Sequence, residues 1–315
     1  MKRYKAVVIG CGKIGAQEWL YQKNMKPATH AGAYEKRRQV ELAGLCDTDS
    51  EKLKRAGKFF PGAKLYQSAE KMLKETKPDI VSVATHTDTH YQFVKMAAEA
   101  GAKAVVCEKP MASSLKKAEA MIEVCKKKKC LLFINHSRHF DLLLKKWQEK
   151  VRGGILGKVI EARCNYHNGF LNNGTHMIDL LRWFLGEVKE AGGTYNSLTS
   201  NPERDKNIDA IIYFKNGAKA VLQSVTKKQG LTEWFFYGRK GKLSLEKLGM
   251  EIHYNNAKAG KCRNLTAQMV SHVVSCLEKK EKPVSTGEDG LAVLKILFAV
   301  KKSAENNGEI TNVIR

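Results

Sequence analysis

The stretch YKAVVIGCGKIG, residues 4–15, decides the fold of this chain. Its first six residues form a short, mostly apolar run that predicts a buried β-strand, and three glycines follow at once. The first glycine permits a tight turn, the second lets a pyrophosphate approach the backbone, and the third lets a helix pack closely on the strand. We therefore predict a Rossmann dinucleotide site, with a purely structural glycine turn as the alternative. The predicted cradle residues are Gly10, Cys11, Gly12, Lys13, Ile14 and Gly15.

Alternation of two element types continues over the first half of the chain. Short apolar runs predict strands, and stretches with apolar residues three or four apart predict helices. Because short buried strands separated by helices form parallel β-α-β units, we expect an α/β fold with a doubly wound sheet and ligands beyond the carboxyl ends of its strands. The further predicted strands are residues 40–46, 80–84, 104–107 and 130–134, and the predicted helices are residues 91–100 and 115–127.

Asp47 directly follows the second predicted strand. We expect its carboxylate to accept from both hydroxyls of the adenosine ribose and to repel a 2′-phosphate, which favours NAD over NADP. A turn aspartate is the alternative. Asp47 lies 32 residues after Gly15, against about 20 in the usual fingerprint. We interpret the excess, around residues 18–31, as an insertion after the first helical turn, with Thr29 able to cap the resumed helix.

The second half of the chain has longer, alternating strands that follow one another with few helices. Such runs, joined by turns such as Lys215-Asn216-Gly217, predict an antiparallel sheet, and one helix at 175–185 interrupts it early. We therefore predict a dinucleotide-binding domain over 1–134 and an α+β domain with a largely antiparallel open sheet over 135–315. Its predicted strands are residues 158–167, 188–196, 208–214, 218–226, 232–238, 242–246 and 251–254.

The sequence Glu108-Lys109-Pro110 closes the fourth predicted strand. Together with the glycine pattern it resembles the glucose–fructose oxidoreductase, inositol dehydrogenase and rhizopine-catabolism family (Gfo/Idh/MocA) of NAD(P)-dependent oxidoreductases. The resemblance implies an NAD-dependent dehydrogenase acting on a hydroxyl carbon of a sugar, sugar derivative or cyclitol. It also implies a final helix, about 287–306, that can pack back on the first domain. Supporting matches lie in residues 85–90, 135–141, 174–179 and 286–306.

The resemblance also suggests which residues form the site. Oxidation of a hydroxyl needs a base for its proton, and histidine suits because its pKa lies near operating pH. His176, three residues before Asp179 on one helix face, is the expected base, and Lys109 is expected to bind the reacting oxygen or share the proton. A buried structural histidine and a surface lysine are the alternatives. The expected cofactor contacts beyond the glycine turn are Asp47, Thr85, His86, His90, Glu108 and Lys109, and the expected substrate contacts are Asn172, Asp179, Arg138, Tyr166 and His30.

Two positions depart from the family pattern. Asn172 stands where the family often has aspartate, four residues before His176, which can alter proton handling. His86 stands where a proline usually follows the threonine, which can change the nicotinamide pocket. Two functional alternatives stay open: a redox-neutral enzyme that retains NAD, and an NAD-binding sensor or accessory subunit without turnover.

Composition limits the partners and the compartment. The formal net charge is +23, but the lysines are spread along the chain, so we expect a solvated surface and no nucleic-acid partner. The eight cysteines form no CxxC pair and no zinc-finger spacing, which predicts reduced thiols, no metal and a cytoplasmic protein. No apolar run reaches the ~18–20 residues of a membrane span. The family resemblance implies a homodimer or homotetramer.

Overall fold

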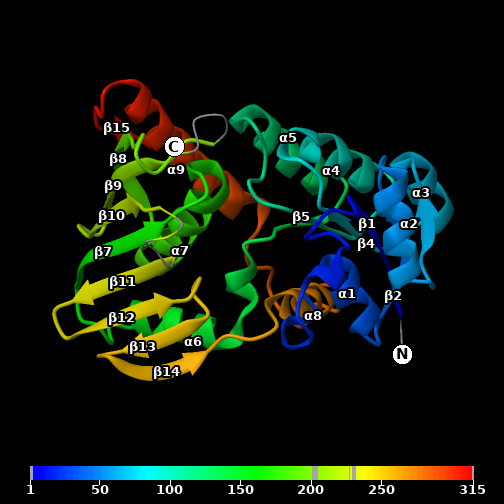
Figure 1. The fold of residues 1–315 in the computed structure, drawn as a ribbon, viewed down its shortest axis with the longest axis horizontal. Helices are drawn as coiled ribbons and strands as arrows, with labels where there is room; N and C mark the ends of the chain where they lie inside the picture. The colour runs from blue at the N-terminus through cyan, green and yellow to red at the C-terminus, as the bar shows by residue number, and fades with distance from the viewer. Residues whose placement is uncertain (1–2, 201–204, 227, 229–231, 314–315) are drawn as a thin grey trace. The chain divides into compact units, whose positions relative to one another are not determined.

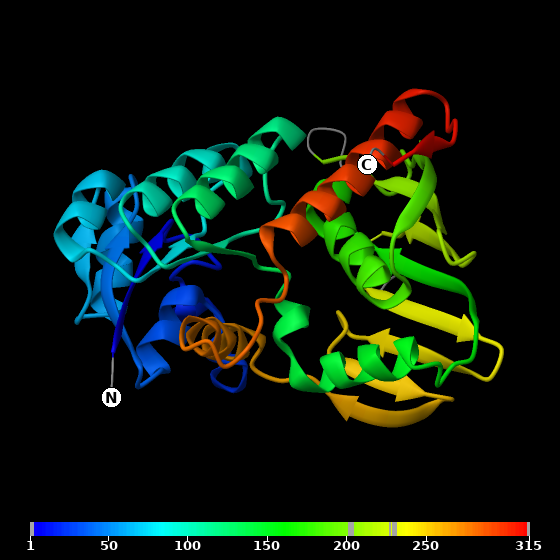
Figure 2. The same ribbon diagram turned by 180° about the vertical axis from the view of Figure 1, so that it is seen from behind.

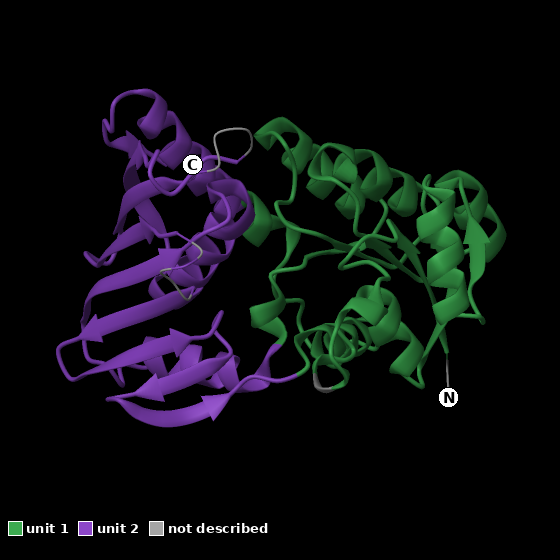
Figure 3. Ribbon diagram, in the orientation of Figure 1, with its two compact units in different colours: residues 1–140, 264–291 green, residues 141–263, 292–315 purple. Residues whose placement is uncertain are grey.

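The computed structural model describes residues 3–200, 205–226, 228 and 232–313. The chain divides into two compact units (Figure 3). Unit 1 comprises residues 1–140 and 264–291, and unit 2 comprises residues 141–263 and 292–315. Each unit contains its own sheet, so the expected combination of a Rossmann domain and an α+β domain is confirmed.

Unit 1 is built around a six-stranded parallel sheet with the strand order β3-β2-β1-β4-β5-β6. Ala6, Val7 and Val8 of β1 are fully buried, as expected for a strand with both faces covered. From β1 the chain moves outward to β2 and β3, and it then returns to continue on the other side of β1 with β4, β5 and β6. The loops after β1 and β4 therefore diverge, and they form the edge where doubly wound folds bind ligands. The strands are β1 (Tyr4–Ile9), β2 (Val40–Cys46), β3 (Lys64–Tyr66), β4 (Ile80–Val83), β5 (Ala104–Cys107) and β6 (Leu131–Ile134).

Helices cover both faces of this sheet. In Figures 1 and 2, α4 and α5 lie along one face, and α1 and α8 lie along the other. The Thr29 hydroxyl accepts a hydrogen bond from the backbone N–H of Gly32, so the predicted cap of the first helix is confirmed. The helices of unit 1 are α1 (His30–Lys36), α2 (Ser50–Phe59), α3 (Ala69–Thr76), α4 (His90–Glu99), α5 (Leu115–Lys127) and α8 (Leu265–Leu277).

Unit 2 contains a nine-stranded sheet with the order β14-β13-β12-β11-β7-β10-β9-β8-β15. Neighbouring strands in it are antiparallel except β7 and β10, which are parallel. The strands are β7 (Val159–Tyr166), β8 (Val188–Tyr195), β9 (Ile208–Phe214), β10 (Lys219–Ser224), β11 (Glu233–Gly238), β12 (Gly241–Glu246), β13 (Glu251–Tyr254), β14 (Ala257–Lys261) and β15 (Thr311–Asn312).

Aromatic side chains join the inner face of this sheet to its helices. The indole Nε1 of Trp234 in β11 donates to the Met177 carbonyl oxygen of α7 at 3.5 Å. Phe236 of β11 stacks on Phe184 of α7 with 4.8 Å between ring centroids. The helices of this half of the chain are α6 (Leu142–Arg152), α7 (Thr175–Leu185) and α9 (Gly287–Glu305). In the described part of the chain, no helix combines the length and apolar character that a membrane span requires.

The division between the units differs from the predicted boundary after residue 134. Unit 1 continues to residue 140, and the chain returns to it over 264–291. This return is made by α8, whose buried Met269 and Val273 belong to the hydrophobic core of unit 1. Of the closing helix α9, only the first turn, 287–291, belongs to unit 1. Apolar packing, and not chain order, therefore sets the division.

Candidate active site

The glycine turn after β1 leaves open the space that a pyrophosphate needs. Gly10 has φ +97°, and a Cβ placed on it would lie 2.5 Å from the Ala84 carbonyl oxygen. A Cβ on Gly15 would collide with the Gly10 carbonyl oxygen, whereas a Cβ on Gly12 would meet no atom within 4 Å among the described residues. Two glycines are therefore required by packing, and the third faces open space. This arrangement fits a dinucleotide pyrophosphate against the backbone.

Asp47 lies half-buried at the carboxyl end of β2, beside this turn. Its Oδ2 accepts from the Cys11 backbone N–H at 2.7 Å, and its Oδ1 accepts from the Asp49 backbone N–H at 2.9 Å. Burial, and secondarily the charge of Asp47, raises the pKa of the Cys11 thiol to about 12, so this cysteine stays protonated.

Residues 16–27 form an excursion that leaves the first helix and returns to it. The backbone N–H of His30 donates to the Ile14 carbonyl oxygen at 3.0 Å, and that of Ala31 donates to Gly15 at 2.9 Å. These are helical hydrogen bonds made across the excursion. The predicted insertion after the first helical turn is therefore confirmed, and it contains two short 3₁₀ turns, Glu18–Leu20 and Lys23–Met25.

Glu18 fixes the point where the excursion re-enters α1. Its side chain is 3% exposed, and it accepts from the backbone N–H groups of Ala28 at 3.0 Å and Thr29 at 2.9 Å. A carboxylate at this position suits the positive end of the helix dipole. On the other side of the excursion, the Tyr21 hydroxyl donates to the Lys13 carbonyl oxygen at 3.4 Å. The excursion is thus attached both to the glycine turn and to α1.

The loop after β4 carries the residues expected near the nicotinamide ribose. Thr85 is half-buried beside Gly10, and His86 is exposed. His90 is 1% exposed, with Nε2 3.1 Å from the Thr85 carbonyl oxygen and Nδ1 3.1 Å from that of Pro110. Burial lowers the pKa of His90, and the carbonyl acceptors and the charge of Glu108 oppose this effect. Both ring nitrogens therefore face backbone carbonyl oxygens, so His90 connects the loop after β4 with the segment after β5.

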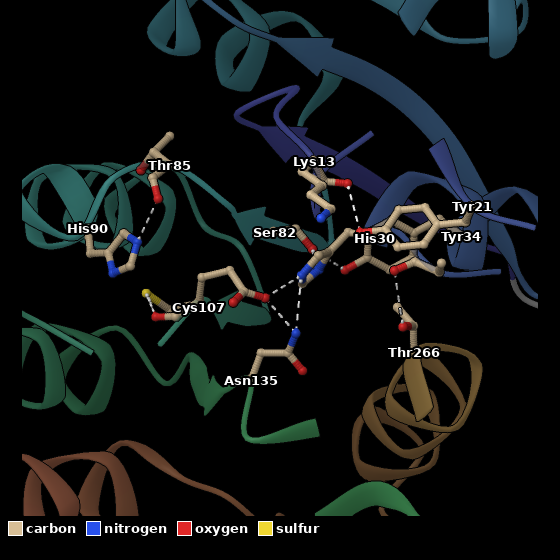
Figure 4. Close-up of polar contacts among 12 residues, drawn as sticks. Lys13, Tyr21, His30, Tyr34, Ser82, Thr85, His90, Cys107, Asn135 and Thr266 are labelled. Atoms are coloured by element: carbon tan, nitrogen blue, oxygen red, sulfur yellow. Dashed lines mark hydrogen bonds and ion pairs between the residues drawn. The ribbon is translucent and has the colours of Figure 1, made fainter. Parts of the chain in front are cut away.

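The Glu108-Lys109 segment follows β5 at the same edge of the sheet. Lys109 is half-buried, while Glu108 is 8% exposed. The Glu108 Oε1 accepts from Asn135 Nδ2 at 2.6 Å and lies 2.9 Å from Nε2 of His30 (Figure 4). Burial acts to raise the pKa of Glu108, but His30, Asn135 and Lys109 together hold it below its usual range. This carboxylate is therefore an ionised group inside unit 1.

In unit 2, the segment before α7 is a five-residue π-helical turn, Phe170–Gly174. The carboxylate of Asp205 caps it by accepting from the backbone N–H groups of Leu171 at 2.9 Å and Asn172 at 2.7 Å. His176 is half-buried in the first turn of α7, and Asp179 is 3% exposed on the following turn. Asp205 thus fixes the backbone that leads directly to His176.

Two family models match this chain, one within unit 1 and one within unit 2. The model of the oxidoreductase family with an NAD-binding Rossmann fold matches residues 4–136. The model of the GFO/IDH/MocA C-terminal domain matches residues 167–244. The chain belongs to the GFO/IDH/MocA family. It is therefore an NAD-dependent oxidoreductase, and the glycine turn with Asp47 provides a fitting site for that cofactor.

Relatives of known name share this family fold. D-apiose dehydrogenase of Paraburkholderia graminis is 24% identical over 96% of this chain and 88% of that protein. Myo-inositol 2-dehydrogenase of Thermotoga maritima is 25% identical over 96% of this chain and 97% of that protein. The solved structure of the WlbA dehydrogenase from Bordetella pertussis, in complex with NADH and UDP-GlcNAcA, has a TM-score of 0.83 at 22% identity and covers 100% of both chains. That likeness shows the shared fold.

Three of the predicted site residues of this GFO/IDH/MocA chain are buried and bound to interior partners. His30, expected to contact substrate, is fully buried with both ring nitrogens occupied by Ser82 and Glu108. Tyr166, also expected to contact substrate, is fully buried, and its hydroxyl donates to the Ile208 carbonyl oxygen at 2.7 Å. Buried polar side chains bind interior partners, and both of these residues do so in this structure. His90 is likewise buried, with both ring nitrogens near backbone carbonyl oxygens.

The remaining predicted site residues fall into two groups by unit. Arg138 lies in a short 3₁₀ turn, Ser137–Phe140, of unit 1, together with the cofactor-side residues, and Asn172, His176 and Asp179 lie in unit 2. Asn172 is exposed, with its side-chain Nδ2 3.3 Å from the Asn168 carbonyl oxygen. Among the described residues, no group of three or more histidine, cysteine or acidic side chains could bind a metal ion.

The residues that support these groups are not predicted from the sequence. Glu18, Ser82 and Asp205 act on backbone or on other side chains, so no motif identifies them. Asn135 lies in the segment 135–141 that supports the family resemblance, and its side chain is hydrogen-bonded to Glu108. Its Oδ1 is buried without a hydrogen-bond partner in the described part of the chain. A polar residue directly after a buried strand was the available signal for Asn135.

Proposed function

We propose that this chain is a dehydrogenase that moves a hydride between NAD and a hydroxyl-bearing carbon of a sugar, sugar derivative or cyclitol. The observation that carries this proposal is the edge of unit 1, where the open glycine turn and Lys109 both follow strands of one parallel sheet. The names of the relatives, which include an apiose and an inositol dehydrogenase, support a polyhydroxylated substrate.

The proposed chemistry assigns one role to each side chain. Bound NAD supplies the hydride acceptor. His176, at the start of α7, takes the proton of the reacting hydroxyl, and Asp179, one turn later, orients its ring or binds a neighbouring hydroxyl. Lys109 donates a hydrogen bond to the reacting oxygen and thereby positions the carbon that loses hydride.

The proposed recognition of cofactor and substrate uses the remaining polar groups. Thr85 and His86 contact the nicotinamide ribose side of the cofactor, and Asp47 contacts the adenosine ribose and favours NAD over NADP. Asn172 and Arg138 are proposed to bind substrate oxygens, since an amide and a guanidinium both donate hydrogen bonds.

The proposed assembly is a homodimer or homotetramer in which a second copy covers the outer face of the nine-stranded sheet. Val221, Arg163 and Phe235 lie side by side on neighbouring strands of that face. Val221 is 36% exposed and Tyr237, on the same face, is 37% exposed. Exposed apolar side chains on a broad sheet favour a protein partner. We place this assembly in the cytoplasm, because all eight cysteines are buried thiols and none forms a disulfide.

The test is a panel of sugars, polyols and sugar nucleotides incubated with NAD and monitored for NADH absorbance. Turnover of at least one compound, lost on removal of Lys109 or His176, is the expected result. Product formation without net NADH, from protein that retains NAD through purification, indicates the redox-neutral alternative. NADH binding without any turnover, together with capture of a protein partner, indicates a sensor or accessory subunit.

A further inference from the structure

Five polar side chains form a continuous chain through the interior of unit 1 (Figure 4). Tyr34 and His30 come from α1, Ser82 comes from β4, and Glu108 and Asn135 directly follow β5 and β6. The Tyr34 and Ser82 oxygens are 2.7 Å apart, and Ser82 Oγ is 2.8 Å from His30 Nδ1. The first three residues are fully buried, and the other two are at most 8% exposed. Polar groups this deep in a protein are costly unless each has a partner.

The hydrogens of this chain fit one direction. Asn135 Nδ2 can only donate, so Glu108 Oε1 accepts from it. When Nε2 of His30 carries a hydrogen, it donates to the same oxygen. His30 Nδ1 then accepts from the Ser82 hydroxyl, which accepts from Tyr34. Every donor therefore points toward Glu108, and a carboxylate that receives such hydrogen bonds is stabilised in its ionised form.

The charge of Glu108 acts on the groups around it. Within unit 1 these are His30 of α1, His90 of α4, Tyr21 of the excursion, and the adjoining Cys107 and Lys109. Burial, Glu18 and Glu108 raise the pKa of Tyr21, so the carboxylate acts on the excursion as well. The ammonium of Lys109, the next residue along the chain, acts on the same carboxylate and lowers the pKa of Glu108, so the two opposite charges attract each other.

We propose that His30 is a positioning residue of the dehydrogenase: its ring is hydrogen-bonded to the buried Glu108 carboxylate and fixes it, and Glu108 in turn holds Lys109, the next residue along the chain, in place. The proposal rests on the role of Lys109 given under the proposed function. It also gives the excursion a purpose, because Glu18 fixes the N-terminus of α1, and His30 is the first residue of that helix.

Three substitutions at His30 separate this role from packing. His30→Gln can donate to Glu108 and accept from Ser82, whereas His30→Leu fills similar space and can do neither. His30→Asn is polar but too short to reach both partners, and it serves if the leucine variant does not fold. The matched control is His272→Leu, because His272 is another buried histidine of unit 1, with Nδ1 2.7 Å from Oε2 of Glu281.

The first measurement needs neither cofactor nor substrate. In ¹³C-glutamate-labelled protein, the Glu108 carboxyl signal is identified by its loss in Glu108→Gln and is titrated with pH. We expect His30→Leu and His30→Asn to protonate Glu108 at least one pH unit higher than wild type, a tenfold change in its proton affinity. His30→Gln and His272→Leu should titrate Glu108 as wild type does.

The second measurement is turnover against pH at saturating NAD. The variants that lose the hydrogen bond should lose at least tenfold in kcat at the acidic end of the range and less at the alkaline end, where Glu108 is ionised again. His30→Gln should keep the wild-type profile. A purely structural role would instead lower turnover equally at all pH values and would lower stability as much as the His272 control does.

The two measurements keep the two proposals apart. A Glu108 titration that is unchanged in His30→Leu or His30→Asn overturns the positioning role, whatever happens to activity. A pH-independent loss of turnover in the same variants also overturns it. A wild-type protein that oxidises nothing on the substrate panel contradicts the proposed function, and the carboxyl titration still decides whether His30 controls the charge next to Lys109.

Discussion

The Asp47 carboxylate binds the glycine turn itself, because its Oδ2 lies 2.7 Å from the Cys11 backbone nitrogen and accepts from it. The residue that follows β2 is thereby joined to the turn that follows β1. A carboxylate has about four acceptor positions, so these internal hydrogen bonds leave capacity for ribose hydroxyls. Asp47 therefore shapes the glycine turn and carries the negative charge to which we assign the proposed choice of cofactor.

Cofactor choice is the first prediction. NAD should bind at least tenfold more tightly than NADP, a difference of about 1.4 kcal/mol, because Asp47 repels a 2′-phosphate. Asp47→Ser should narrow this gap in calorimetric titrations with both cofactors. Asp49→Asn is the matched control, since asparagine can still cap α2 and the nearby charge is removed. Equal or tighter binding of NADP by the wild-type protein would reject the role of Asp47.

The second prediction concerns the excursion. Deletion of residues 16–27 joins the two helical segments that are already hydrogen-bonded to each other, so the variant should fold. The N–H groups of Ala28 and Thr29, which Glu18 binds in the wild type, then lie inside the joined helix, so the free energy of unfolding in denaturant should change little. The KM for the true substrate should nevertheless rise, because loops beside a site commonly shape access to it.

A smaller change tests the same segment. Tyr21→Phe removes the hydroxyl that donates to the Lys13 carbonyl oxygen and leaves the ring in place. We expect it to weaken cofactor or substrate binding, while Leu20→Ser, at an exposed position of the same segment, leaves both unchanged. If the deletion variant keeps wild-type kinetics, the excursion has no role in binding the cofactor or the substrate.

The third prediction concerns the outer face of the nine-stranded sheet. Tyr237→Glu removes an exposed aromatic ring from the proposed interface and adds a carboxylate opposite Glu161, so light scattering should show a smaller assembly. Leu198→Glu is the control, because Leu198 is 90% exposed and lies outside the strands. A wild-type protein that is monomeric at all concentrations would contradict the proposed assembly.

Local signals in the sequence predict many of the helices and strands, but they do not predict the hydrogen-bond networks of the buried side chains. β1, β2, β5 and α5 have the predicted bounds because each has a clear apolar pattern, and Gly10 after β1 and the capping Ser114 before α5 mark two of their ends. β3 was missed, since it has only three residues and two of them are exposed. The parallel pairing of β7 with β10 was also missed, because strand order within a sheet depends on packing across the whole unit.

The site shows the same limit for a physical reason. The glycine turn is readable from the sequence because packing requires Gly10 and Gly15, while Gly12 leaves open space. His30 was instead given a substrate role, since a sequence does not reveal that a histidine lies between Ser82 and Glu108 in the interior. Such contacts join residues 52 and 78 positions apart, and periodicity carries no information over that separation.

The last prediction is the proton path. His176→Ala should lower turnover by roughly 10²–10⁴ with nearly unchanged NAD affinity, because it removes the base and no cofactor contact. Lys109→Ala should lower turnover comparably, partly through lost positioning. The wild-type profile should rise with pH in the neutral range, where imidazole loses its proton, and this rise should disappear in His176→Ala.

Asn172→Asp tests the base from the opposite direction. A carboxylate four residues before His176 would stabilise the imidazolium and raise its pKa, so a higher pH would be needed to free the base. The rising limb of turnover should therefore move to higher pH, and Asn172→Ala should show no such shift. Steady-state turnover of the two variants across pH, with NAD saturating, measures the difference. A His176→Ala enzyme that stays active with the wild-type pH profile would remove His176 from the mechanism and leave Lys109 as the group that handles the proton.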